Sequence, residues 1–131
     1  EVEASFILGI DVGPNPVDLE SAATQIASLG APGRVVLHSS RGAVCLEPDG
    51  TLIRRPALDV PEDFVKGSTG AGDAFTAGFL HGVHEDCDGA ECLLLATCVA
   101  AASLADPSAS RGVLPLSDCL SLAARFGFRD F

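Results

Sequence analysis

The chain has 131 residues, and its 18 acidic against 8 basic side chains give a formal net charge of −10. A length of this order fits one domain that can bury a hydrophobic core without disulfide bonds. Such an acidic chain repels the phosphate backbone of nucleic acids and the anionic surface of membranes, so neither is expected as a partner.

The cysteines and the apolar runs restrict the protein class further. The five cysteines include no Cys-x-x-Cys pair and leave an odd number, so the sequence predicts neither a zinc site nor a disulfide framework. The longest uncharged apolar run, Cys92 to Ala105, has 14 residues and is too short to cross a bilayer. We therefore expect a soluble, cytoplasmic protein with reduced and mostly buried thiols.

The beginning of the chain predicts two helices separated by a break. The sequence opens in a short helix, and the run Gly13-Pro14-Asn15-Pro16 interrupts it because glycine and proline disfavour a continuous helix. Asp18 is expected to cap a second helix over 19–29, which has apolar residues at helical spacing and ends at Gly30.

The next part of the chain predicts strands. Residues 34–37 form a short run rich in β-branched side chains, which is typical of a buried strand. Residues 43–46 and 52–55 flank Pro48-Asp49-Gly50, a strong turn signal, and together they predict a β-hairpin. Val60-Pro61 adds an extended piece before a glycine-rich turn.

Three helices are predicted in the second half, over 70–83, 91–104 and 116–126. In the first, Gly78 and Gly82 share a stripe with apolar residues and permit a neighbour to approach closely. The second is apolar on almost every side, as a helix inside a core would be. A strand, a glycine turn and then a helix is the order seen where nucleotides bind α/β folds.

The glycine turn itself, Ser68-Thr69-Gly70-Ala71-Gly72-Asp73, is the most informative segment. Its glycines let successive backbone N–H groups point at one anion, and the start of a helix adds partial positive charge. Asp73 falls in the first helical turn, where a carboxylate can accept the proton of a hydroxyl that attacks phosphorus. A purely structural turn, in which the acid favours only the helix dipole, fits the same spacing.

Two common phosphate motifs do not fit this segment. No Gly-Lys-Ser/Thr follows it, so it is not a Walker A loop. Phe75 stands where the dinucleotide fingerprint requires its third glycine.

The longer stretch from Lys66 to Phe79 resembles the C-terminal signature of the ribokinase-like (phosphofructokinase B) carbohydrate kinases, Asp-Thr-x-Gly-Ala-Gly-Asp-x-Phe. The match is nearly complete from Gly70 to Phe75. It departs earlier, because Gly67 and Ser68 stand where the family has Asp and Thr. In the family this Asp helps to bind a monovalent cation, so the departure puts such a cation in doubt for this chain.

The resemblance implies roles for the residues of the turn. The anion hole for the transferring phosphoryl group would be formed by Gly70, Ala71 and Gly72, and the catalytic base would be Asp73. The opening residues look like the family's Asn-x-x-Glu helix with its Asn cut off, which makes Glu3 the residue that helps to organise Mg²⁺ and phosphate.

The resemblance also implies a nucleotide site. Residues 37–42 stand where the family has Thr-Leu-Gly-x-x-Gly, and Ser110-Arg111-Gly112-Val113 resembles the family loop beside the purine. The residues implied for the cofactor are Ser39, Gly42, Thr69, Thr97, Arg111 and Gly112. Structural explanations stay open beside these roles: a turn glycine at 42, a threonine bonded to its own helix at 97, and a solvated carboxylate at Glu3.

The fold and the function follow from the same resemblance. It implies an α/β, three-layer ribokinase-like fold, of which residues 1–131 would be a single, truncated C-terminal nucleotide-binding portion. The activity would be ATP-dependent phosphoryl transfer to a hydroxyl of a sugar or sugar-like alcohol, with Mg²⁺. The sugar-binding part and the lid would be missing, so we expect the isolated chain to be inactive and any homo-oligomer to form through the missing part.

Two alternatives remain. A non-catalytic nucleotide-binding module, a degenerate relative of the kinases, is favoured by the departures at Gly67 and at 37–39, whereas Asp73 favours catalysis. A dinucleotide-dependent oxidoreductase would need a glycine-rich turn directly after the first strand, but here the glycines follow the hairpin.

Overall fold

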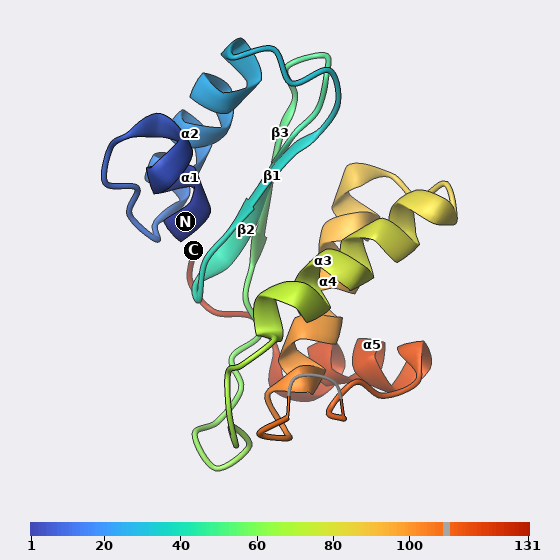
Figure 1. The fold of residues 1–131 in the computed structure, drawn as a ribbon. Coiled ribbons are helices and arrows are strands. Elements are labelled where there is room, and N and C mark those ends of the chain that lie inside the picture. The colour runs from blue at the N-terminus through green and yellow to red at the C-terminus, as the bar shows by residue number, and fades with distance from the viewer. Residues whose placement is uncertain (109–110) are drawn as a thin grey trace. The chain divides into compact units, whose positions relative to one another are not determined.

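The computed structural model describes residues 1–108 and 111–131, and the chain divides into two compact units (Figure 1). Unit 1 comprises Glu1–Pro56 and Asp130–Phe131, and unit 2 comprises Ala57–Arg129. Helices and a small sheet together form the mixed α/β class that the sequence predicts.

Two helices open unit 1. Helix α1 (Val2–Leu8) ends at Gly9, and α2 (Pro16–Ser28) begins with proline in its first turn. The side chain of Asn15 accepts the N–H of Asp18 at 3.0 Å and caps α2. The prediction of Asp18 as the cap was wrong, because proline fits the first helical position and lets the helix start earlier.

The sheet of unit 1 has three antiparallel strands in the order β1-β2-β3. They are β1 (Val35–His38), β2 (Gly42–Leu46) and β3 (Leu52–Pro56), which confirms the predicted strand and hairpin. The register places Leu37 opposite Val44 and Cys45 opposite Ile53.

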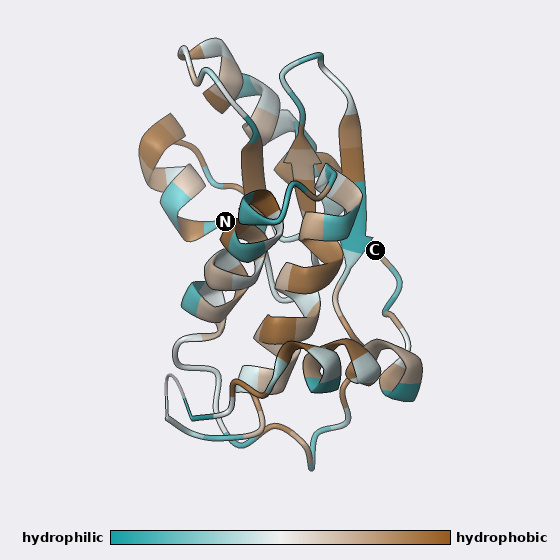
Figure 2. Cartoon of the chain, turned by 90° about the vertical axis from the view of Figure 1, so that its right-hand side faces the viewer, coloured by the Kyte–Doolittle hydropathy of each residue, from teal (hydrophilic) through white to brown (hydrophobic). Residues whose placement is uncertain are grey.

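The core of unit 1 lies between α2 and one face of the sheet. Leu19, Ala22 and Ala23 of α2 are buried with Val35 and Val44 of the strands. Figure 2 shows hydrophobic residues, in brown, along the strands. Burial of these apolar side chains is the main force that holds the helix on the sheet.

The described residues of unit 2 form the helices α3 (Ala71–His84), α4 (Gly89–Ser103) and α5 (Leu116–Phe126). Helix α4 starts before the predicted Glu91 because Asp88 caps it: the Asp88 carboxylate accepts the Glu91 N–H, and the Glu91 carboxylate accepts the Asp88 N–H. The extended piece predicted at Val60-Pro61 joins no sheet; between β3 and α3 only Leu58 makes an isolated bridge, with Phe128.

Helices α3 and α4 pack closely through glycines, as the sequence predicts. A Cβ placed at Gly78 would lie 2.9 Å from the Cα of Ala96, and one at Gly82 would lie 3.1 Å from the Cα of Cys92. These two contacts show that the helices run antiparallel, so the start of α3 lies beside the end of α4. Helix α4 is buried on most sides, which confirms its predicted place in the core.

The structure also bears on two predictions made from composition, the lack of a membrane-spanning run and the burial of the thiols. Among the residues that the structure describes, no helix has both the length and the apolar character needed to cross a bilayer. Four of the five cysteines are buried and Cys87 is half-buried, which agrees with the predicted burial of the thiols.

Candidate anion-binding and catalytic site

The glycine turn forms the N-terminal end of α3. Gly70 is the N-cap residue and has φ 82° and ψ −1°, a left-handed conformation that glycine adopts without steric cost. The N–H of Ala74 donates to the Gly70 carbonyl at 2.8 Å and starts the helix. The N–H of Ala71 donates to the Ser68 carbonyl at 3.2 Å.

The other amides of the turn are available to a ligand. Among the described residues, the N–H groups of Gly70, Gly72 and Asp73 have no hydrogen-bond acceptor. The first N–H groups of any α-helix lack intrahelical partners, and the helix dipole makes this end positive. This end of α3 can therefore bind an anion, although Ala71, which the sequence assigns to the same anion hole, already uses its N–H within the turn.

Asp73 lies in the first turn of α3 and is exposed. Its carboxylate makes no hydrogen bond or ion pair with any described residue. An exposed carboxylate next to unpaired amides can reach a hydroxyl that approaches a bound phosphoryl group.

The segment just before the turn rests on the loop after α4. The Lys66 N–H donates to the Leu104 carbonyl at 2.7 Å, and a Cβ placed at Gly67 would lie 2.9 Å from the Cα of Pro107. The glycine at 67, a departure from the kinase signature, thus has a packing reason in this chain. Sequence reasoning missed Leu104 and Pro107, for which the only local signal is the turn composition of Asp-Pro-Ser at 106–108.

The remaining candidates of unit 2 lie on α4 and after it. Thr97 is 6% exposed within α4, and its hydroxyl has no hydrogen bond to a described residue, including its own helix. Arg111 is exposed, and its N–H donates to the Ser108 hydroxyl at 3.2 Å. Gly112 is buried, and a Cβ there would lie 2.7 Å from the Ser103 carbonyl oxygen, so packing alone requires glycine. Ser110 lies outside the described residues.

Comparison with known proteins identifies the family. The model of the pfkB family carbohydrate kinases matches residues 1–115. The chain belongs to this family. No curated protein matches it.

Solved structures with the same fold are longer than this chain. Ribokinase of Arabidopsis thaliana, complexed with ribose and ATP, is 25% identical with a TM-score of 0.79 over 93% of this chain and 38% of its own. Phosphofructokinase-2 of Escherichia coli, in complex with potassium, is 19% identical with a TM-score of 0.77 over 95% and 38%. A nucleoside kinase of Burkholderia thailandensis, in complex with inosine, is 21% identical with a TM-score of 0.69 over 99% and 39%. The pfkB-family chain therefore spans under two fifths of these relatives.

Two candidates of the pfkB-family chain lie in unit 1, at the β1–β2 connection. The Ser39 hydroxyl donates to the Pro14 carbonyl at 2.9 Å and accepts the Arg41 N–H at 3.1 Å. Gly42 is buried in β2, where a Cβ would lie 2.7 Å from the Arg55 carbonyl oxygen and 2.8 Å from the Phe131 ring. Both residues have structural roles here, and their nucleotide contacts remain predictions.

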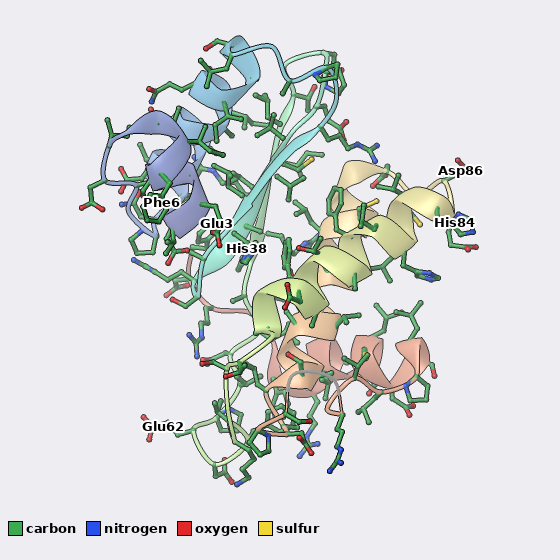
Figure 3. The ribbon with its side chains drawn as sticks, viewed as in Figure 1. Glu3, Phe6, His38, Glu62, His84 and Asp86 are labelled. Atoms are coloured by element: carbon green, nitrogen blue, oxygen red, sulfur yellow. The ribbon has the colours of Figure 1, made fainter. Side chains whose placement is uncertain are left out.

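Glu3, the predicted magnesium residue, is an exposed carboxylate on α1 (Figure 3). The part of the chain that the structure describes contains no group of three His, Cys, Asp or Glu side chains arranged to hold a metal ion. The carboxylate of Glu3 interacts with His38, whose pKa is lowered from 6.5 mainly by burial and then by the N-terminal ammonium, while Glu1 and Glu3 oppose this. Glu3 alone is one carboxylate, and its role with Mg²⁺ remains a prediction.

A cysteine and two histidines lie near the α3–α4 connection. Burial, followed by the carboxylates of Glu91 and Glu85, raises the pKa of the Cys87 thiol, so this cysteine is a poor nucleophile at neutral pH. His81 and His84 are exposed on the last turn of α3, and His84 stands at the helix end with Asp86 (Figure 3). Both imidazoles therefore face solvent.

Proposed function

We propose that this chain supplies the anion hole and the catalytic base of an ATP-dependent kinase that phosphorylates a hydroxyl of a sugar or sugar-like alcohol. The start of α3 carries the proposal: left-handed Gly70, unpaired amides and the exposed Asp73 lie within one helical turn. Membership of the pfkB family carbohydrate kinases supports a carbohydrate acceptor.

ATP with Mg²⁺ would supply the phosphoryl group and much of the charge neutralisation that phosphoryl transfer needs. The N–H groups of Gly70, Gly72 and Asp73 donate to oxygens of the phosphoryl group and stabilise its negative charge. The Asp73 carboxylate accepts the proton of the acceptor hydroxyl as its oxygen bonds to phosphorus. Thr69, in the signature, and Arg111, in the loop that resembles the family loop beside the purine, are the flanking residues that the resemblance implies for the nucleotide.

The proposal concerns a longer enzyme, because the relatives contain much additional chain. This chain spans 38% of the Arabidopsis ribokinase. Most of the rate in this reaction class comes from placing the reactants and from electrostatics. We therefore expect the 131 residues alone to show no kinase activity.

An Asp73→Asn variant in a complete enzyme that contains this chain tests the proposal. Turnover should fall by about 10²- to 10⁴-fold, the usual contribution of a positioned base. Asp118→Asn is the matched control, because Asp118 is also an exposed acid in the first turn of a helix, α5. Both changes remove the same interaction with a helix dipole, so equal and near-normal turnover in both variants would exclude Asp73 as the base.

A second candidate is a nucleotide-binding module without catalysis. It is favoured by Gly67, because the backbone of Pro107 leaves no room for the Asp of the family signature at this position. Such a module would bind MgATP but would transfer no phosphate to any member of a panel of sugars, whereas the kinase would phosphorylate at least one.

A further inference from the structure

Two loops of unit 2 meet immediately before the glycine turn. The Lys66 N–H donates to the Leu104 carbonyl at 2.7 Å, and Gly67 faces Pro107 so closely that a Cβ would lie 2.9 Å from its Cα. The obstructing atom belongs to the backbone and cannot rotate away as the end of a flexible side chain could. Glycine at 67 therefore permits a contact that any other residue would push apart.

Residues 104–108, which directly follow α4, are held by local hydrogen bonds. The Asp106 carboxylate accepts the Ser108 N–H at 2.8 Å, and the Asp106 N–H donates to the Ser103 carbonyl at 3.4 Å. The ring of Pro107, between the two residues of the first bond, restricts its φ angle. These bonds restrain residues 106–108, on which the segment before the turn rests.

The supported segment leads directly into the anion-binding turn. Gly67 precedes Gly70 by three residues, and the Ser68 carbonyl within this interval accepts the Ala71 N–H. Peptide units are planar and stiff, so a displacement at 67 is passed along these few units to the turn. On the other side of the turn, α3 is fixed by the contact of Gly78 with Ala96.

We propose that Gly67 and Pro107 are positioning residues for the anion-binding turn, which they fix through their backbone contact. The inference rests on the proposed function, because it concerns the direction of the amides assigned to the phosphoryl group. Neither residue touches the anion. Hydrogen bonds to an anion weaken steeply with distance and angle, so a shift of the turn amides by a few tenths of an ångström should weaken anion binding by about tenfold.

The test is a titration of the isotope-labelled 131-residue chain with MgATP, followed by the backbone amide NMR signals of Gly70 and Gly72. In Gly67→Ala these signals should differ before ligand is added, and the Kd for MgATP should rise about tenfold. Gly33→Ala is the matched control, because Gly33 is exposed and a Cβ there meets no atom within 4 Å. The control should bind MgATP as the wild type does.

A second variant separates positioning from folding. Pro107→Gly changes an exposed residue and frees its backbone, so it should weaken binding by a few-fold on its own. Combined with Gly67→Ala, it lets the loop move away from the added methyl group, and the double variant should lose less affinity than the two single losses multiplied. A general loss of stability would not produce this coupling.

The outcomes distinguish the two proposals. If the wild type binds MgATP and neither Gly67→Ala nor Pro107→Gly changes Kd, the positioning role is wrong and the anion site stands. If the wild type shows no shift of the turn amides, the anion site is wrong and the positioning role falls with it. If Gly67→Ala does not fold, Pro107→Gly decides: weaker binding supports the role, and unchanged binding overturns it.

Discussion

The close contact between α3 and α4 makes Gly78→Ala a sharp test of the packing that holds the glycine turn. A Cβ at 78 would lie 2.9 Å from the Cα of Ala96, 3.1 Å from its N and 3.1 Å from the Leu95 carbonyl oxygen. All three are backbone atoms, so the steric clash can be removed only if one helix moves away from the other. Because ordinary contact begins at 3.4 Å, the 2.9 Å contact needs about 0.5 Å of separation.

Two opposing effects determine how much Gly78→Ala changes the free energy of unfolding. Alanine is better than glycine inside a helix by about 1 kcal/mol. Overpacking of a tight contact costs about 1–3 kcal/mol, and separating the helices also weakens the dispersion contacts beside Gly78. The net of the two effects is a reduction in the free energy of unfolding of up to about 2 kcal/mol, and because all three contacts are with backbone atoms we expect the upper part of this range for Gly78→Ala.

Urea unfolding followed by far-UV circular dichroism measures this change. Ala77→Gly is the control, because Ala77 is exposed on the same helix and its replacement isolates the helix propensity, a loss of about 1 kcal/mol. If Gly78→Ala instead gained about what Ala77→Gly loses, the helices would not approach as described and the reasoning would be refuted.

Three further predictions concern caps, pH and cations. Asp88→Ala removes the capping box of α4 and should lower the unfolding free energy by about 1 kcal/mol in urea; an unchanged midpoint would contradict the cap. Hydrogen bonding from Ser108, first by its side chain and then by its N–H, lowers the pKa of Asp106 below 3.8. The ionised Asp106 carboxylate therefore contributes to the free energy of unfolding above its unfolded pKa, and this contribution is lost as pH falls through its folded pKa. The backbone amide NMR signal of Ser108 should accordingly shift on acidification in the wild type but not in Asp106→Asn. Replacing K⁺ by tetramethylammonium should leave turnover of the complete enzyme unchanged, because Gly67 offers no carboxylate; clear activation by K⁺ would disprove this.

Local sequence signals predicted most of the elements. Helical spacing, proline and glycine indicated α2 to α5, and a turn signal indicated the hairpin, because these features depend on residues close along the chain. The cap of α2 was mistaken because Asn15 and Asp18 are both good caps, and the favourable position of Pro16 decided between them.

The conformation of the glycine turn was also accessible from the sequence. Gly70 adopts the left-handed geometry that the pattern Gly-Ala-Gly-Asp indicates, and Asp73 lies in the first helical turn as predicted. Both properties depend only on residues close along the chain: the first on the conformational freedom of glycine, and the second on where the helix begins. The pattern did not show that the Ala71 N–H is used within the turn.

The sequence by itself thus determined which segments form helices and strands and which glycine takes the left-handed conformation before α3. The tertiary structure alone decided what each glycine makes room for: Pro107 at Gly67, Ala96 at Gly78 and the Phe131 ring at Gly42. A glycine in a sequence shows that a side chain is absent, but the atom that occupies the space comes from a distant part of the chain. Only folding brings the two together, because such contacts depend on how elements pack and not on the residues next to the glycine.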